Sequence, residues 1–173
     1  RRLTDKLRGS LEASDYKDVI LGLVFLKYVS DAFNERRAAI EDELGEDYGP
    51  DELAETLEDP DEYTGHGVFW VDPDARWDAL VVQAKVEGHK TIGQRINEAM
   101  DLLMGDNSSL EGTLPRLFNR PNVDQRRLAE LLDLLNSMQF SGQGASKARD
   151  LLENRKLMIA TTVVAIASLL GAA

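Results

Sequence analysis

The sequence has no cysteine and only two histidines among its 173 residues. Without cysteine, the chain cannot form a disulfide scaffold, use a thiolate nucleophile or hold zinc or an iron–sulfur cluster through cysteine ligands. The two histidines, His66 and His89, lie far apart in the sequence, and His66 stands between two glycines. Isolated histidines beside glycines are commonly solvated loop residues, so we expect no metal site and no histidine general base.

Basic residues are scarce as well, because 20 Lys and Arg stand against 31 Asp and Glu, a formal net charge of −11. This balance argues against a chain that binds nucleic acid alone by electrostatic attraction. The acidic excess lies in the segment 41–62, which holds twelve acidic residues and no Lys or Arg. This acidic segment lacks the ligand order of a calcium loop, and we interpret it as a solvated face; repulsion that directs DNA to another face is a second interpretation.

The chain has no early apolar run that would indicate a secretory signal, and it begins at Arg1 without a methionine. We therefore expect a fragment of a longer protein. Its 43% hydrophobic residues are enough for the core of one domain.

Apolar spacing predicts an all-α, bundle-like domain with at most one short extended segment near 66–71. Residues 16–33 are apolar almost all round, apart from a narrow stripe of Lys27, Ser30, Asp31 and Asn34, and predict a long buried helix. Further helices are predicted after Pro50, from Asp72-Pro73 to about Ala84, after the capping box Thr91–Gln94, and over 128–138. Between the last two, 107–122 is turn-rich.

Several separated landmarks resemble one family. Leu7-Arg8-Gly9, Tyr16-Lys17 and the run from Leu21 to Phe33 are similar to the opening of the modification subunit of type I restriction-modification systems. Later landmarks in the same order are Phe69-Trp70-Val71, Ala75-Arg76-Trp77, Ile92-Gly93, Ala99-Met100, and Asn107 with Leu110-Glu111-Gly112 and Leu114-Pro115. The resemblance covers roughly Leu3 to Leu152.

That modification subunit is an adenine-specific DNA methyltransferase that uses S-adenosylmethionine. The resemblance implies an N-terminal helical domain over 1–152 that packs on the catalytic domain of the same chain and on the specificity subunit. With a second modification subunit, it would help to close the assembly around duplex DNA in the cytoplasm of a bacterium or archaeon.

The catalytic motifs of such enzymes are not evident in this sequence. The adenine-binding loop needs a Pro-Pro pair, and none occurs. Phe140-Ser141-Gly142-Gln143-Gly144 matches the form of the cofactor loop, but the stretch before it predicts a helix where the loop requires a strand. We interpret it as an inter-helix linker. We therefore predict no catalytic, cofactor-binding or metal residues here, and no methyltransferase activity of the fragment alone.

One basic cluster is a candidate for contact with DNA phosphates. Arginines on a turn and at a helix N-terminus can contact phosphates while helix N–H groups assist. The candidates are Arg116, Arg120, Arg126 and Arg127, with Lys90 and Arg95 as weaker ones beside the capping box. The alternative is that the arginines pair with acids of the catalytic domain or of the acidic segment.

Trp70 and Trp77 are interpreted as core or inter-helix packing rather than base-stacking residues, and Tyr28 and Phe33 as core. The uncharged tail 157–173 departs from the family pattern, so we treat 153–173 as an atypical apolar segment that is not native to the domain; a C-terminal membrane anchor is the alternative.

Two functions remain open at this point. The first is an assembly and DNA-clamping domain of a methyltransferase subunit. The second is a free-standing acidic helical protein–protein adaptor or inhibitor, whose acidic segment mimics or repels nucleic acid.

Overall fold

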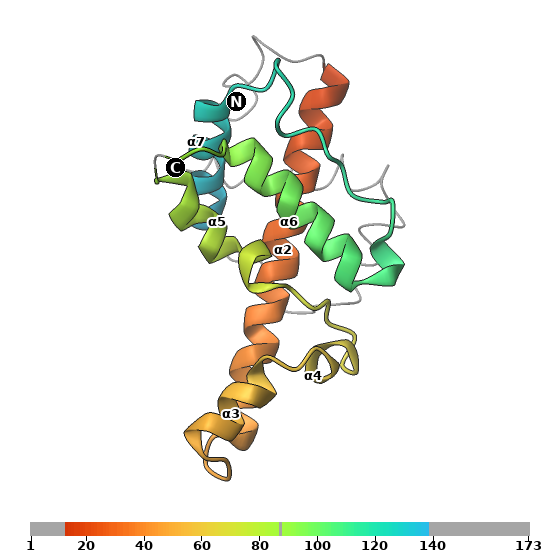
Figure 1. Ribbon diagram of the computed structural model, residues 1–173. Coiled ribbons are helices and arrows are strands. Elements are labelled where there is room, and N and C mark those ends of the chain that lie inside the picture. Colours follow the sequence, from red (N-terminus) through yellow and green to blue (C-terminus); the bar gives the residue numbers. More distant parts are fainter. Residues whose placement is uncertain (1–12, 87, 139–173) are drawn as a thin grey trace, which may run out of the picture.

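The computed structural model describes residues 13–86 and 88–138, and within these ranges it contains helices and loops but no strand (Figure 1). The elements are α2 (Ala13–Leu44), α3 (Pro50–Leu57), α4 (Asp61–Thr64), the 3-10 turn η1 (Pro73–Ala75), α5 (Trp77–Ala84), α6 (Ile92–Asp106), the 3-10 turn η2 (Ser108–Leu110) and α7 (Gln125–Asn136). The predicted all-α class is confirmed.

The long helix α2 runs through the centre of the domain, because its side chains are apolar on nearly every face between Val19 and Phe33. Helices α5, α6 and α7 pack around this part (Figure 1). The predicted polar stripe is largely buried, since Lys27 and Ser30 are only 4% and 1% exposed. Ser30 Oγ accepts a hydrogen bond from the Trp77 backbone N–H at 3.1 Å, and Lys27 pairs with Asp31. The stripe therefore contacts the start of α5.

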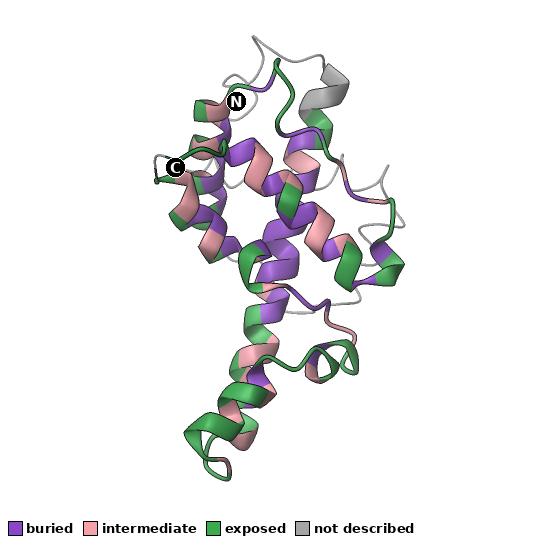
Figure 2. Ribbon diagram, viewed as in Figure 1, coloured by how far each residue is buried: buried purple, intermediate pink, exposed green. Residues whose placement is uncertain are grey.

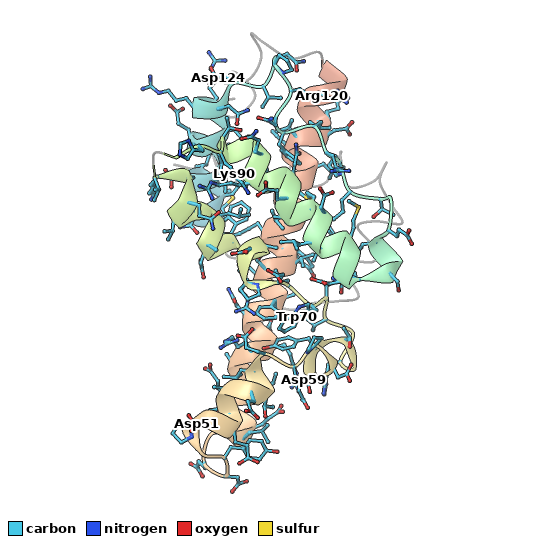
Figure 3. The ribbon with its side chains drawn as sticks, in the orientation of Figure 1. Asp51, Asp59, Trp70, Lys90, Arg120 and Asp124 are labelled. Carbon is cyan, nitrogen blue, oxygen red and sulfur yellow. The ribbon has the colours of Figure 1, made fainter. Side chains whose placement is uncertain are left out.

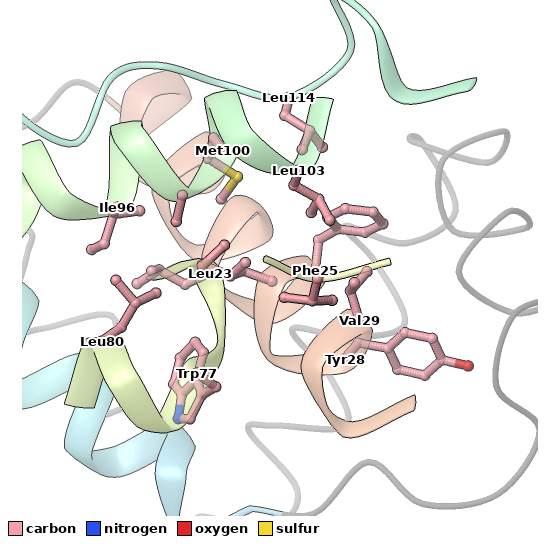
Figure 4. Close-up of a cluster of buried hydrophobic side chains, with 14 of the residues drawn as sticks. Leu23, Phe25, Tyr28, Val29, Trp77, Leu80, Ile96, Met100, Leu103 and Leu114 are labelled. Carbon is pink, nitrogen blue, oxygen red and sulfur yellow. The ribbon is translucent and has the colours of Figure 1, made fainter. Parts of the chain in front are cut away.

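In the part of the core that Figure 4 shows, labelled side chains of α2, α5 and α6 lie beside Leu114 of the loop that follows η2. Buried residues of α2, α5, α6 and α7 form one cluster, together with Leu114, Leu117 and Phe118 of the loop that precedes α7. Trp77 is 2% exposed, and Trp70, Tyr28 and Phe33 are buried too, which confirms that all four belong to the core.

The predicted helix from Pro73 to Ala84 is wrong in its first turn. The Asp72 side chain caps η1 by accepting from the Asp74 N–H at 2.9 Å, and Arg76 is then extended, with φ −64° and ψ 139°. The helix α5 begins only at Trp77. The Trp77 N–H donates to Ser30 Oγ, and the Arg76 side chain donates to the Val71 carbonyl. These contacts stabilise the extended conformation of Arg76 between η1 and α5.

The predicted capping box at the start of α6 is confirmed, with the Gln94 N–H donating to Thr91 Oγ1 and the Thr91 N–H to Gln94 Oε1. The extended segment that we predicted near 66–71 has no strand partner in the described part of the chain. Instead the buried Asn107 side chain accepts from the Trp70 N–H at 3.1 Å and donates to the Trp70 carbonyl at 2.9 Å. An amide side chain thus makes the hydrogen bonds that a neighbouring strand would make.

The domain has two regions of different exposure. The C-terminal part of α2 and helix α3 extend away from the other helices (Figure 1), and most residues there are exposed (Figure 2). This extension contains most of the acidic segment. Between residues 13 and 138, residue 87 excepted, no helix combines the length and apolar composition that crossing a membrane requires. The apolar tail 157–173 lies outside the described residues.

Candidate nucleic-acid interface

The six candidate cations lie on two helix starts and on the loop between α6 and α7. Lys90 precedes the N-cap of α6, Arg95 lies in its first turn, and Arg126 and Arg127 lie in the first turn of α7. The loop carries Arg116 and Arg120, which are both exposed. We call these six residues the cationic surface.

Direct hydrogen bonds join the two helix starts. Gln125 Oε1 accepts from the Gly93 N–H at 2.7 Å, which links the first turn of α7 to that of α6. Thr91 Oγ1 donates to Asn119 Oδ1 at 2.7 Å and ties the loop to the same place. Lys90, Arg120 and Asp124 lie toward one end of the molecule, and Asp51 of the acidic segment lies toward the other (Figure 3). The fold therefore brings together residues that lie as much as 37 positions apart in the sequence, from Lys90 to Arg127.

A buried side chain and hydrogen bonds fix the loop between α6 and α7 to the core. Phe118 is fully buried, its N–H donates to Asn97 Oδ1 at 3.2 Å, and its carbonyl accepts from Gln125 Nε2 at 3.0 Å. A Cβ built on Gly93 would lie 2.1 Å from the Phe118 carbonyl oxygen, so only glycine permits this approach. The backbone that carries Arg116 and Arg120 is thus held on α6.

Most of the cationic side chains already have a polar partner nearby. Arg116 pairs with Asp101 at 2.7 Å, and Lys90 pairs with Glu98 at 2.9 Å. The other contacts are Arg126 with Glu130 at 3.8 Å, Arg127 with Asp124 at 3.6 Å, and Arg95 with Gln83 at 3.0 Å. Of the arginines for which we considered pairing with acids, Arg116, Arg126 and Arg127 have partners on α6, on α7 and at the N-cap of α7, outside the acidic segment.

The helix N–H groups that we expected to assist phosphate binding are occupied at α7. Asp124 Oδ1 accepts from the Arg126 N–H at 3.0 Å and from the Arg127 N–H at 3.2 Å. A carboxylate in this place caps the helix and adds negative charge where a phosphate would sit. Contact with an anion at the start of α7 therefore depends on the arginine side chains.

The acidic segment has basic partners that the sequence analysis missed. Arg36 donates to the Glu62 carbonyl at 3.0 Å and pairs with Glu43 at 3.2 Å. Arg37 and Arg76 both pair with Glu58, at 2.8 and 2.7 Å. Arg37 forms an i, i+4 pair with Glu41 that helical spacing could have indicated, and Arg36 and Glu43 lie on the same helix. The contacts with Glu58 and Glu62 join parts of the chain that are distant in sequence.

Arg76 connects these charges to the aromatic core. Its guanidinium carbon lies 4.7 Å from the Phe33 ring centroid and 5.6 Å from that of Trp70, and its Nε donates to the Val71 carbonyl. Phe33 also stacks on Tyr63 of α4 at 4.4 Å. This arrangement fixes the end of α3 and the whole of α4 against α2, and we interpret it as a structural junction.

The hydrogen bonds from Arg76, and then those from Arg37, lower the pKa of the Glu58 carboxyl and outweigh the effect of its partial burial. We expect Glu58→Gln to reduce the free energy of unfolding by about 0.5–1 kcal/mol at neutral pH, a small effect because the pair is partly exposed. A lowered pKa stabilises the fold above the ordinary pKa of glutamate, and this stabilisation is lost as the pH falls through the lower folded-state pKa. The deficit of the variant should therefore shrink on acidification.

Chemical denaturation of both proteins at neutral and acidic pH measures this deficit. Glu55→Gln, at an exposed position of α3, is the matched control and should reduce the free energy of unfolding less than Glu58→Gln does at neutral pH. A deficit of Glu58→Gln that stays constant or grows in acid would contradict the assignment.

Comparison with known proteins identifies the family. The protein-family model described as the HsdM N-terminal domain matches residues 2–135 of the sequence, which is more than half of the chain. The chain belongs to this family. It is also 32% identical over 146 residues to the "Type I restriction enzyme MjaIX methylase subunit" of Methanocaldococcus jannaschii (strain ATCC 43067 / DSM 2661 / JAL-1 / JCM 10045 / NBRC 100440). The alignment covers 80% of this chain but 26% of that relative, so the chain spans about a quarter of the methylase subunit.

The range matched by the HsdM N-terminal domain contains the acidic segment and all six residues of the cationic surface. The resemblance predicted from separated landmarks is therefore confirmed. Phe140–Gly144 and the tail 157–173 lie beyond the matched range and outside the described residues.

The two histidines are the remaining candidates for metal binding or general-base chemistry that we considered in this HsdM N-terminal domain. His66 and His89 are exposed, as predicted, and His66 Nε2 lies 3.1 Å from Arg36 Nη2. Among the described residues, no group of three or more His, Asp or Glu side chains is placed to bind a metal ion.

Proposed function

We propose that this chain is the assembly and DNA-clamping domain of a type I modification subunit, an adenine-specific DNA methyltransferase. Membership of the HsdM N-terminal domain family and the similarity to a methylase subunit support the placement in such a subunit. The same findings favour this function over a free-standing adaptor or inhibitor. The proposed DNA contact rests on the cationic surface.

The observation that carries the DNA contact is the separation of charges in the fold. Lys90, Arg95, Arg126 and Arg127 lie at the joined starts of α6 and α7. Lys90 and Arg120 lie toward one end of the molecule, and Asp51 of the acidic segment lies toward the other (Figure 3). The acidic segment would repel a duplex, and the cationic surface would attract its phosphates. A net charge of −11 is therefore compatible with a local DNA contact.

The chemistry of methyl transfer belongs to the remainder of the longer subunit in this proposal. S-adenosylmethionine and the flipped adenine would bind to the catalytic domain, and 1–152 would act as the helical domain that precedes it. Its partners would be that catalytic domain, the specificity subunit and a second modification subunit, in the cytoplasm. The specificity subunit would choose the target sequence.

DNA binding of the 173-residue chain, measured by fluorescence anisotropy with a short labelled duplex over a range of salt concentrations, tests the contact. We expect weak, salt-dependent binding that falls about tenfold in Arg126→Ala/Arg127→Ala at low salt. The dependence of the logarithm of the binding constant on the logarithm of the salt concentration should weaken by about one for each lost phosphate contact.

Lys85→Ala is the matched control. Lys85 is an exposed cation at the C-cap of α5 that pairs with Asp133 and does not belong to the cationic surface, so its loss should change binding much less than the loss of Arg126 and Arg127. Equal binding of the double arginine variant and the unmodified chain would overturn the DNA contact and leave the family assignment intact.

A further inference from the structure

The pairing of the cationic surface follows a pattern that the DNA contact alone does not require. Three of its members have a carboxylate partner on the solvent side of α6 or α7. Arg116 pairs with Asp101, Lys90 with Glu98, and Arg126 with Glu130. Asp101 and Glu98 belong to α6, and Glu130 belongs to α7.

These pairs differ from the charge pairs at the structural junction. The Arg116 and Arg126 side chains are 64% and 90% exposed, whereas that of Arg36 is 11% exposed. Arg36 and Arg76 also donate to the backbone carbonyls of Glu62 and Val71. The three exposed pairs join one side chain to another. Exposed ion pairs contribute little to folding because water screens them. They can therefore be broken at small cost.

We infer that Asp101, Glu98 and Glu130 compete with DNA phosphates for Arg116, Lys90 and Arg126, and so limit the affinity of the domain for DNA. This inference rests on the proposed DNA contact. A phosphate that binds Arg116 competes with the carboxylate that already contacts its Nη2 at 2.7 Å. This competition weakens binding by the isolated domain.

The consequence is a contact that depends on the assembly. When partner subunits hold a duplex against the domain, the effective concentration of phosphate is high and the exchange of carboxylate for phosphate becomes favourable. The free domain would remain paired with its own carboxylates. Asp124 is not included among the competitors, because it also caps α7 and its loss would disturb the helix.

The test compares two triple variants with the same change in net charge. Asp101→Asn/Glu98→Gln/Glu130→Gln removes the three competitors. The control, Asp133→Asn/Glu46→Gln/Asp47→Asn, removes three exposed carboxylates elsewhere, including one on α7 that pairs with Lys85. We expect the first variant to bind the duplex about fivefold more tightly than the unmodified chain, and the control to change binding less than about twofold.

A double-mutant cycle gives the pair-specific result. Asp101→Asn should tighten binding in the unmodified chain but have no effect when Arg116 is already alanine. Equal tightening by both triple variants, or a gain from Asp101→Asn that persists without Arg116, would overturn the inference. These outcomes differ from failure of the proposed function, in which Arg126→Ala/Arg127→Ala binds DNA as well as the unmodified chain. Thermal unfolding of each variant verifies that the fold is retained.

Discussion

Trp77→Ala is expected to lower the free energy of unfolding by about 3–5 kcal/mol. Trp77 is the first residue of α5 and is 2% exposed, and its ring fills the space between α2 and α7 (Figure 4). Its Nε1 donates to Asn136 Oδ1 at 3.1 Å, and Lys27 Nζ lies 5.9 Å from its ring centroid. Truncation creates a cavity, breaks the link to α7 and removes the aromatic partner of a buried ammonium group.

Urea denaturation followed by circular dichroism measures this change. Trp77→Phe is the control, because it keeps most of the ring volume and loses the indole N–H, and we expect a clearly smaller loss. Domains of this size are stable by only about 5–15 kcal/mol, so the alanine variant can be largely unfolded. The phenylalanine variant then gives a measurable free energy of unfolding. A loss below about 1 kcal/mol for Trp77→Ala would contradict its place in the core.

Gly93→Ala is expected to destabilise the domain by about 1–3 kcal/mol. The added Cβ would lie 2.1 Å from the Phe118 carbonyl oxygen and 2.6 Å from its carbon, and backbone atoms cannot move aside as a flexible side chain would. The loop must therefore shift away from α6. Because this loop carries Arg116 and Arg120, the DNA affinity of the variant should fall together with its stability.

Gly105→Ala provides the matched control on the same helix. A Cβ at Gly105 has no neighbour within 4 Å, so alanine should stabilise the domain by about 0.5–1 kcal/mol through its higher helix propensity. Thermal and urea denaturation of the two variants should thus give changes of opposite sign. The same sign for both would show that the close approach of α6 and the loop does not limit stability.

The sequence predicted those features that local periodicity and capping determine. The long apolar run became α2, Thr91 and Gln94 form the capping box, and the leucines of α7 face the core. These assignments depend on residues within one or two helical turns of each other. The i, i+4 pair of Arg126 and Glu130 also depends on local spacing, although we did not predict it.

Features that depend on tertiary contacts were not predicted. The break at Arg76 follows from bonds to Val71 and Glu58, and its extended conformation has no local sequence signal. Asn107 binds the backbone of Trp70, 37 residues away, in a place where we expected only a turn. The position of Asp124 before α7 is typical of an N-cap, and its side chain accepts from the N–H groups of Arg126 and Arg127. Whether a phosphate can bind at this helix start then depends on the arginine side chains nearby.

The continuity of α2 fixes a distance between the two charged regions. Gly22 lies against Pro115 and Phe118 of the arginine-bearing loop, and the helix then runs without interruption to Leu44, within the acidic segment. At 1.5 Å per residue, this stretch measures about 33 Å. The helix thus acts as a rigid spacer, and the regions of opposite charge cannot approach each other and neutralise one another while α2 stays intact.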